Sequence, residues 1–185
     1  MNKRLSEMTL EELWRLFPII LTEHRSYWVD WYNEERSLLN ALLPFDVEFH
    51  HVGSTAIKGI MAKPIIDILI AVNTIEQIKE VAKILQDNNY IIMSSNANRI
   101  SLNKGYTENG FAERVFHLHV RLKNDIDEIY FRDYLNMHPE IAKEYQELKL
   151  RLCKEYRHNR DAYTEAKTDF VKKYTSMAKR TLKEQ

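Results

Sequence analysis

Apolar residues follow two different periods along this chain, and each period predicts its own kind of element. Spacings of three and four residues predict helices, and a short helix is expected after Thr9, with Glu12 at the position of a capping box. A longer helix is expected over residues 26–43, and another, capped by Thr74, runs to about residue 88. Alternation and short apolar runs predict strands at 17–21, 45–52, 65–72, 90–93, 99–102 and 113–122.

The last third of the chain has the helical period throughout. Three helices are expected there, beginning near residue 125, at Pro139 and near Arg160, the last of them running to about Lys179. Polar connectors between strands are expected at 94–98 and 103–110. The pattern therefore predicts an α+β protein, with a mixed β-sheet flanked by helices and a C-terminal helical lobe.

Composition narrows the class of protein. With 44% hydrophobic and 29% charged residues, the chain is typical of a globular protein with a sizeable core. The 27 basic and 27 acidic residues balance, so there is no strong signal for nucleic-acid binding. No apolar run approaches the ~18 residues of a membrane span, and the start lacks the apolar core of a signal peptide. Cys153 is the single cysteine, so no disulfide within the chain is expected, and a cytoplasmic protein is predicted.

One carboxylate interrupts the strand predicted at 65–72. Asp67 lies within Ile-Ile-Asp-Ile-Leu-Ile, where a buried carboxylate without a partner is costly. Twelve residues before it, the preceding strand ends in Gly53-Ser54-Thr55. The glycine lets backbone N–H groups approach an anion, and the serine hydroxyl can donate to a phosphate oxygen. Together these features predict a site for phosphate, where Asp67 would hold a divalent metal that bridges the phosphates.

The Gly-Ser turn, the gap and the Asp in an apolar strand resemble the nucleotidyltransferase fold of the polymerase-beta superfamily. More closely, the chain resembles the GrpB family through HVGST at 51–55, Gly59, AKPIIDI at 62–68, FHLHV at 116–120 and FRDYL at 131–135. Tyr-x-x-x-Lys also occurs at 145–149 and 163–167, as in that family. The resemblance spans roughly residues 26–175. It implies a nucleotidyltransferase-like α/β core at 26–124, an N-terminal extension at 1–25 and a C-terminal helical lobe at 125–185 packed on the core.

The catalytic pattern of that superfamily is incomplete in this chain. The resemblance places a second carboxylate two residues after Asp67, where the chain has Leu69. A third carboxylate usually comes from a neighbouring strand. Alternation in 113–122 separates an apolar face from a face that carries Glu113, His117, His119 and Arg121. One carboxylate holds Mg²⁺ poorly, whereas an Asp with two imidazoles suits Zn²⁺ or Mn²⁺, or a metal-free site in which the Asp orients a histidine.

The candidate site residues fall into two groups. Asp67, His117 and His119 are predicted as catalytic residues and as ligands of a divalent metal, which is Mg²⁺, Mn²⁺ or Zn²⁺. The residues expected to bind a small phosphate-containing molecule, a nucleoside triphosphate in the leading hypothesis, are Gly53, Ser54, Thr55, Lys63, Arg114, Arg132 and Lys167. We expect both groups to converge in one cleft, with the C-terminal helices as a wall from which Tyr163 also looks inward.

The same features have structural interpretations that the residues leave open. The Gly-Ser-Thr turn can be an ordinary connection with a hydroxyl cap. Asp67 can form a structural ion pair with Lys63 or Arg114, and Arg132 can form one with Asp133. Buried ion pairs of this kind rarely stabilise a fold more than apolar packing does, which favours a role for Asp67 in a site.

Three functions are compatible with this pattern. The first is a nucleotide-binding protein that transfers a nucleotidyl group to a small acceptor. The second is a catalytically lapsed module that binds a nucleotide or a coenzyme, and the resemblance favours it because some GrpB proteins are fused to dephospho-coenzyme A kinase. The third is a metal-dependent hydrolase that uses Asp67, His117 and His119. Release of pyrophosphate would separate the first from the second, and metal analysis would separate the third from both.

Overall fold

The structure, a computed structural model, describes residues 3–183, so the outermost residues of the predicted extension and lobe, 1–2 and 184–185, lie outside the described residues. The strands are β1 (Glu48–Val52), β2 (Ile65–Val72), β3 (Ile91–Ser95), β4 (Arg99–Thr107) and β5 (Gly110–Leu122). The α-helices are α1 (Leu10–Leu16), α2 (Trp28–Leu42), α3 (Ile75–Asp87), α4 (Asp127–Met137), α5 (Pro139–Glu155), α6 (Arg160–Glu165) and α7 (Thr168–Lys183). Two short 3-10 turns are η1 (Leu5–Glu7) and η2 (Ser54–Ala56).

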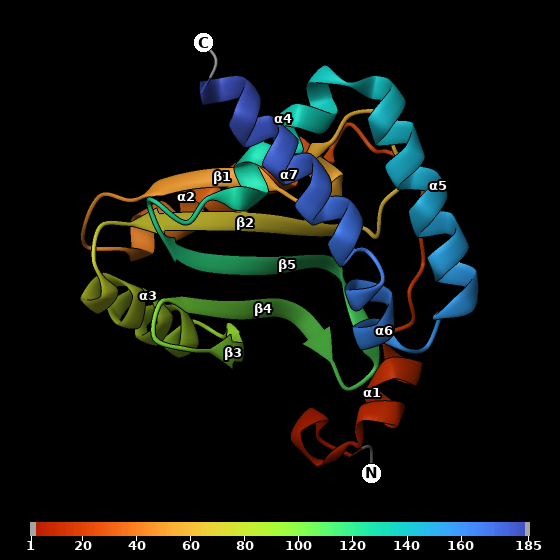
Figure 1. Ribbon diagram of the computed structural model, residues 1–185. Helices are drawn as coiled ribbons and strands as arrows, with labels where there is room; N and C mark the ends of the chain where they lie inside the picture. The colour runs from red at the N-terminus through yellow and green to blue at the C-terminus, as the bar shows by residue number, and fades with distance from the viewer. Residues whose placement is uncertain (1–2, 184–185) are drawn as a thin grey trace.

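The five strands form one sheet in the order β1-β2-β5-β4-β3, which runs from top to bottom in Figure 1. β2 and β5 are parallel, and the other three pairings are antiparallel. The register sets Asp67 beside His117 and Leu69 beside His119, so these four side chains share one face. The predicted α+β class, with a mixed sheet flanked by helices, is confirmed.

The other face of the sheet forms the main hydrophobic core. The strand residues that project to it are Ile66, Ile68, Ile70, Val72, Phe116, Leu118 and Val120. Helices α2 and α3 cover them, with Trp28 and Leu39 from α2 and Ile78 and Leu85 from α3 fully buried. The hydroxyl of Thr74 accepts the Gln77 N–H and caps α3, as its sequence predicts. Alternation in the strands and the helical period in α2 and α3 therefore predict side chains that meet in the same core.

The C-terminal helices lie on the face that carries Asp67 and the histidines. Ile126 and Ile129, at the start of α4, pack against Leu69 and Ala71 of β2. The remaining helices pack on α4 and on one another through Phe131, Tyr134, Tyr145 and Tyr174. Figure 1 shows α5, α6 and α7, from cyan to blue, standing along one side of the sheet. Their position leaves space between their inner surfaces and the ends of β2 and β5.

Residues 17–21 do not form the predicted strand. Pro18 has no N–H for a sheet ladder, and the N–H of Ile19 donates to the carbonyl oxygen of Arg157 at 2.9 Å. An isolated bridge joins Thr22 to Ala62. The segment is therefore held by the loop after α5 and by the chain that precedes β2.

The stretch 103–110 is strand rather than the predicted connector. β4 continues to Thr107 and β5 begins at Gly110, so the turn between them holds only residues 108 and 109. A bulge accommodates Gly105 at φ +92°, where an added Cβ would lie 2.3 Å from the carbonyl oxygen of Arg114. The polar composition of 103–110 predicts a loop. The polar groups of this hairpin instead find buried partners within the fold, and the segment can therefore form strand.

The last predicted helix, 160–179, is two helices. A turn at residues 166 and 167 separates α6 from α7. The turn changes the direction of the chain and places Lys167 at the wall of a cavity. Helical periodicity continues across this bend, which is why the sequence alone predicts one element.

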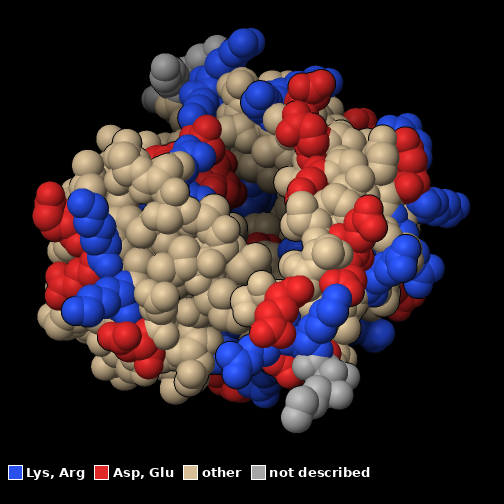
Figure 2. All heavy atoms as spheres, turned by 90° about the horizontal axis from the view of Figure 1, so that it is seen from below, with Lys and Arg blue, Asp and Glu red and all other residues tan. Residues whose placement is uncertain are grey.

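Among residues 3–183, no helix is both long and apolar enough to cross a bilayer. Figure 2 shows one face of the molecule, on which basic and acidic side chains are interspersed. The same view shows a hollow near the centre, with charged atoms inside it. The zero net charge is therefore not the sum of two large opposite patches on this face.

Candidate functional site: a lysine cavity beside an Asp-His pair

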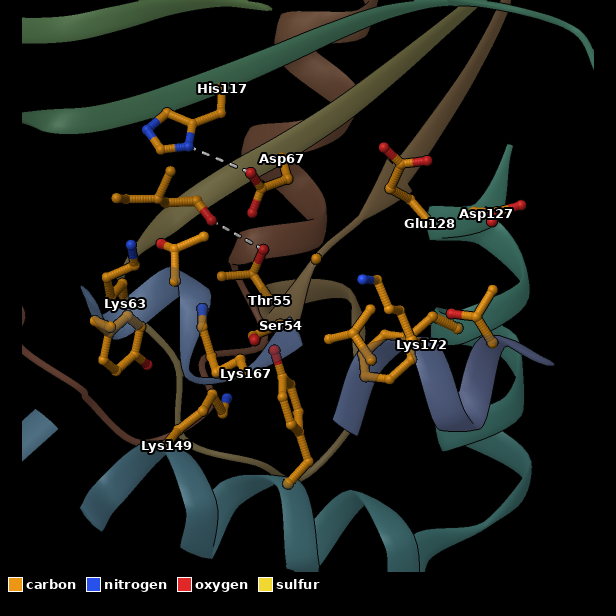
Figure 3. A pocket seen from close by; sticks show the side chains of 18 of the residues that line it. Ser54, Thr55, Lys63, Asp67, His117, Asp127, Glu128, Lys149, Lys167 and Lys172 are labelled. Carbon is orange, nitrogen blue, oxygen red and sulfur yellow. Dashed lines mark hydrogen bonds and ion pairs between the residues drawn. The ribbon is translucent and has the colours of Figure 1, made fainter. Parts of the chain in front are cut away.

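A cavity of about 630 Å³ lies between the sheet and helices α5, α6 and α7. We call it the lysine cavity, because Lys63, Lys149 and Lys167 project into it from three different segments (Figure 3). Of the predicted site residues, those that line it are Gly53, Ser54, Thr55, Lys63, Asp67, His117 and Lys167. Tyr163 also lines it, as expected from the sequence. The structure thus brings most of the predicted residues together.

The turn after β1 requires glycine at its first position. Gly53 has φ +71°, and an added Cβ would lie 2.3 Å from Oδ2 of Asp67. Thr55 then fixes the turn, since its hydroxyl donates to the carbonyl oxygen of Ile65 at 3.1 Å. Nε2 of His51 lies 3.0 Å from the same hydroxyl oxygen. Thr55 is therefore occupied in positioning the turn against β2, while Ser54 faces the cavity.

Asp67 is held by two imidazoles. Its Oδ1 lies 3.4 Å from Nδ1 of His117 and 3.2 Å from Nε2 of His119. Burial acts to raise the pKa of Asp67, but the hydrogen bonds from the two histidines outweigh it and hold the pKa below its usual range. Burial lowers the pKa of His117, and the Asp67 carboxylate only partly opposes this. A neutral His117 can thus donate to Asp67 from Nδ1 while its Nε2 meets the Tyr106 hydroxyl at 2.8 Å.

The predicted metal stays a prediction, and the present arrangement does not fit one. Both imidazole nitrogens that face Asp67 lie within hydrogen-bonding reach of the same oxygen, so they do not point at a common empty position. Leu69 stands where a second carboxylate would be needed. Among residues 3–183, no group of three or more His, Cys, Asp or Glu side chains is arranged to hold a metal ion. A cation here would have to replace the contacts between Asp67 and the histidines.

Lys149 is buried, Lys63 and Lys167 are half-buried, and none of the three has a carboxylate partner among the described residues. Lys149 is 1% exposed and donates to the carbonyl oxygen of Met61 at 2.5 Å. Lys63 and Lys167 lie over the ring of Tyr163, at 5.7 and 4.2 Å from its centroid. No salt bridge joins any of the three to a described Asp or Glu. This end of the cavity thus holds several amino groups and, in Asp67, a carboxylate that the histidines already engage.

Burial and mutual repulsion act on the charge of these lysines. Burial, followed by the charges of Lys167 and Arg160, lowers the pKa of Lys63 to about 7, with partial opposition from Asp67. Burial, followed by the charges of Lys167 and Lys63, lowers the pKa of Lys149 to about 7. Burial also lowers the pKa of Lys167 to about 8. An anion in the cavity would reverse these shifts by stabilising the ammonium forms.

Two predicted ligand-binding residues and one predicted catalytic residue do not line the cavity. Arg114 shares the strand face of Phe116, and there it pairs with Glu34 and lies 5.3 Å from the ring of Trp31. Arg132 donates to the carbonyl oxygen of His51 at 2.7 Å. It also pairs with Asp133, which is the structural alternative considered from the sequence. His119 does not line the cavity, but it contacts Asp67, which does.

Sequence reasoning missed Lys149 and Arg160, which both line the cavity. A signal for Lys149 exists, because Tyr-x-x-x-Lys occurs twice, at 145–149 and at 163–167. In both copies the lysine lies over a tyrosine ring, at 4.9 Å for Lys149 on Tyr145. In α5, residues four apart meet on one helix face; in the second copy, the turn after α6 places Lys167 over the ring of Tyr163.

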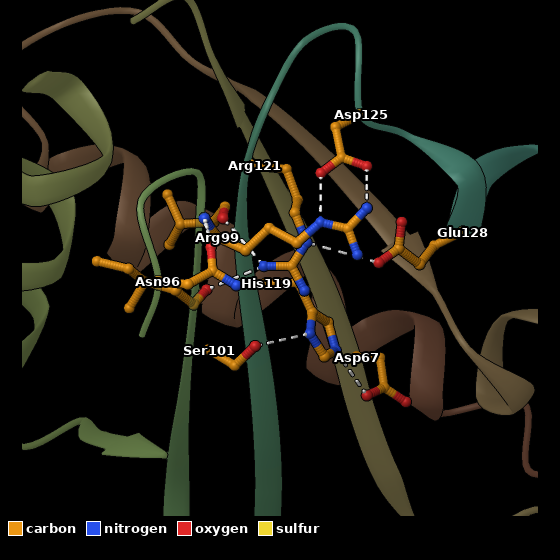
Figure 4. A network of polar contacts seen from close by, with 10 residues as sticks. Asp67, Asn96, Arg99, Ser101, His119, Arg121, Asp125 and Glu128 are labelled. Atoms are coloured by element: carbon orange, nitrogen blue, oxygen red, sulfur yellow. Dashed lines mark hydrogen bonds and ion pairs between the residues drawn. The ribbon is translucent and has the colours of Figure 1, made fainter. Parts of the chain in front are cut away.

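The opposite end of the cavity carries carboxylates, and these are paired. Asp127 pairs with Lys179, and Glu128 lies 3.7 Å from the Nε of Arg121. The network in Figure 4 links Asp67 through His119 to Ser101, and places Arg99, Arg121, Asp125 and Glu128 close by; the Arg99 Nε donates to Asp125 at 2.6 Å. Charge is therefore balanced at this end, while the lysine end holds the surplus.

The fold and the site define an α+β protein with a cationic cavity, in which Leu69 stands where a two-metal centre would need a second carboxylate. Residues 18–177 match the family model described as GrpB protein, and the chain belongs to the GrpB family. The resemblance found in the sequence is thus confirmed.

Relatives agree with this assignment. The chain is 36% identical to the glutamate-rich protein GrpB of Alkalihalophilus pseudofirmus over 83% of this chain and 91% of that protein. It is 33% identical to the UPF0157 protein YqkA of Bacillus subtilis over 90% of this chain but spans only about half of YqkA, 48%. The crystal structure of conserved protein GrpB from Enterococcus faecalis aligns with a TM-score of 0.76 at 28% identity, over 88% of this chain and 99% of that one.

A more distant likeness is to Cid1 poly(U) polymerase. One of its structures aligns with a TM-score of 0.45 at 12% identity, over 78% of this chain and 44% of that chain. This likeness concerns the fold at most and says nothing about chemistry.

Proposed function

We propose that the lysine cavity binds a small phosphate-bearing molecule, and that this molecule is a nucleoside triphosphate. The observation that carries the proposal is the set of three lysines without carboxylate partners, of which Lys149 is buried and Lys63 and Lys167 are half-buried. A buried charge without a countercharge costs several kcal/mol, roughly, and in the described part of the chain these ammonium groups face a backbone carbonyl and two tyrosine rings instead of a carboxylate. A polyanion offsets it directly, because each charge-assisted hydrogen bond contributes about 1.5–3 kcal/mol.

The other donors around the cavity suit the same ligand. Ser54 offers a hydroxyl at the turn that Gly53 makes possible, and Arg160 adds a fixed cation. The hydroxyl of Tyr145 is a further donor, since burial raises its pKa to about 12 and keeps it protonated. These groups come from segments far apart in sequence, which is typical of a ligand site rather than of a local structural pair.

Binding is better supported than nucleotidyl transfer. Metal-assisted transfer needs carboxylates that bridge metal ions. Here Leu69 occupies the second position, and Asp67 is engaged by two histidines. We therefore propose a nucleotide-binding module, located in the cytoplasm where nucleoside triphosphates are available, over a transferase.

Calorimetry and thermal unfolding with sodium tripolyphosphate and with ATP, GTP, CTP and UTP test the proposal. A bound polyanion at 100 times its Kd should add about 2.7 kcal/mol to the free energy of unfolding. Sodium sulfate at matched ionic strength is the control for general salt effects. If neither tripolyphosphate nor any nucleotide stabilises the protein beyond sulfate, the proposal is wrong.

The same samples decide between binding and transfer. With Mg²⁺ and a mixture of small hydroxyl and amino acceptors, a binding module should release no pyrophosphate above the rate of buffer alone. Steady release that depends on Asp67 and disappears in the Asp67→Asn variant would instead favour the transferase.

A further inference from the structure

A second cavity, which we call the apolar cavity, adjoins the lysine cavity. Its volume is about 760 Å³, and it lies where η1 and α1 meet the lower strands and the start of α6, at the bottom of Figure 1. The side chains that matter here are Leu5, Leu13, Phe17, Met93, Tyr106 and Arg160. None of the residues predicted from the sequence to bind a ligand lines it.

The two cavities share a wall. Arg160 lines both, and its guanidinium carbon lies 5.4 Å from the centroid of the Tyr106 ring. The Tyr106 hydroxyl in turn meets Nε2 of His117, which lines the lysine cavity, at 2.8 Å. No described carboxylate forms a salt bridge with Arg160. A cation without an acidic partner therefore stands at the junction.

The lining suits a flat apolar group. Phe17 is buried, and its ring centroid lies 4.7 Å from that of Tyr106, so the two rings form an aromatic floor. Met93 is 54% exposed at the rim, where its flexible thioether can adapt to a ring. Such a pocket, with a few polar groups at one end, is typical of a small-molecule site.

We infer that the apolar cavity holds the aromatic part of the ligand whose phosphates occupy the lysine cavity, with Arg160 at the connection between the two parts. The inference rests on the proposed function and adds the class of ligand, an aromatic ring joined to a phosphate chain. No bond is made or broken in this binding. Arg160 lines both cavities, and Tyr106 of the apolar cavity contacts both Arg160 and His117, which argues for one ligand that spans both.

The test compares tripolyphosphate with ATP, GTP, CTP and UTP by calorimetry on the full chain. Because stacking on aromatic side chains strengthens binding, at least one nucleotide should bind about tenfold more tightly than tripolyphosphate. Met93→Glu and Met93→Lys should both remove this advantage and leave the affinity for tripolyphosphate within about twofold. A through-space effect would have opposite signs in the two variants, so a loss in both identifies lost apolar contact.

Two control variants complete the design. Met93→Leu keeps an apolar side chain of similar volume and should keep the nucleotide advantage. Leu38→Glu places a charge on an exposed apolar position of α2, on the other side of the sheet, and should change neither affinity. Light scattering on each variant shows whether a second copy of the chain occupies the rim instead.

The outcomes are distinguishable. Tripolyphosphate binding without any nucleotide advantage, or an advantage that survives both charged variants, overturns this inference and leaves phosphate binding standing. A change in molar mass in the charged variants assigns the surface to a second copy and also overturns it. If neither tripolyphosphate nor any nucleotide binds, the proposed function fails, and this inference fails with it.

Discussion

Lysine side chains lie on both faces of the sheet, and their polar partners differ between the two faces. On the core face, Lys104 donates to Glu35 at 2.8 and 3.1 Å, and the hydroxyl of Tyr90 donates to the same carboxylate at 2.5 Å. On the other face, Lys63 and Lys149 line a cavity, and neither forms a salt bridge with a described Asp or Glu. We call the first group the Glu35 network.

The difference in partners distinguishes a lysine that is paired within the fold from the lysines that we propose bind a ligand. In the Glu35 network, the cation, the carboxylate and the phenol satisfy one another inside the chain, between α2 and the hairpin of β3 and β4. In the lysine cavity, the fold supplies cations from three segments, and we propose that a ligand supplies the countercharge. Both arrangements bury charge, and only the second gives a physical reason to bind an anion.

The largest effect is expected from Glu35→Gln. The substitution strands Lys104 against Tyr90, and breaking a buried pair costs about 3 kcal/mol, at the low end of the usual range because Lys104 is one-third exposed. Urea unfolding at pH 7 measures the loss. Glu34→Gln, which breaks an exposed pair with Arg114, is the matched control and should cost less than about 1 kcal/mol. Equal losses in the two variants would remove the basis of the comparison.

Lys149→Met should lower ligand affinity and leave stability nearly unchanged, in contrast to Glu35→Gln, which should lower stability. Replacing a buried charge with an apolar side chain of similar length should leave the free energy of unfolding unchanged or slightly raised without ligand. The affinity for tripolyphosphate should fall about tenfold or more, since a charge-assisted hydrogen bond is lost. Lys154→Met, at an exposed position of the same helix, should change neither quantity. A large loss of stability with unchanged affinity would make Lys149 structural.

The pH dependence of stability sharpens the same contrast. Lys63 and Lys149 have pKa values of about 7 in the folded protein, against about 10.4 when unfolded, so the unfolded chain binds more protons between these values. The free energy of unfolding without ligand should therefore rise from pH 7 to about pH 9.5. Above that range, buried tyrosines such as Tyr145, whose pKa is raised to about 12, act in the opposite direction.

Ligand binding should cancel this rise. Bound tripolyphosphate favours the ammonium forms of all three lysines, so calorimetry at pH 8.5 in buffers of different ionisation enthalpy should show uptake of roughly two to three protons. At pH 6 the uptake should be close to zero. Binding without proton uptake at pH 8.5 would mean that the lysines are already charged, and would contradict the comparison.

The smallest effect is expected from divalent metals alone. Because the histidines already contact Oδ1 of Asp67, adding Mg²⁺, Mn²⁺ or Zn²⁺ without nucleotide should shift Tm by less than about 1 °C, and chelation by EDTA should not lower it. A shift of several degrees that disappears in His117→Gln would restore the predicted metal site. It would also show that the two histidines rearrange around an ion.

Several features of this protein could be read from local sequence. Thr9 and Thr74 cap their helices as predicted, because capping depends on residues three positions apart. The two faces of β5 follow from alternation, which placed His117 and His119 on the side opposite the core. The same alternation puts Arg114 with Phe116, so its place outside the cavity was already implicit in the pattern.

The register between β2 and β5 could not be predicted from local sequence and is known only from the fold. Asp67 and His119 are 52 residues apart, and only the parallel pairing brings them within 3.2 Å. The hairpin at 103–110 was hidden for a related reason. Its polar side chains are typical of a loop until Glu35, 69 residues from Lys104, supplies the partner that allows burial.

The sequence alone determined the kinds of element, the composition of the core and the residue types of the site, because periodicity, capping and strand alternation act over a few residues. Tertiary structure alone decided which charges would be paired. Lys104 meets a glutamate, Arg132 meets a backbone carbonyl and an adjacent aspartate, and Lys149 meets a backbone carbonyl and a tyrosine ring instead of an acid. Whether a buried cation belongs to the fold or to a ligand depends on neighbours that lie far away along the chain, and local patterns carry no information about them.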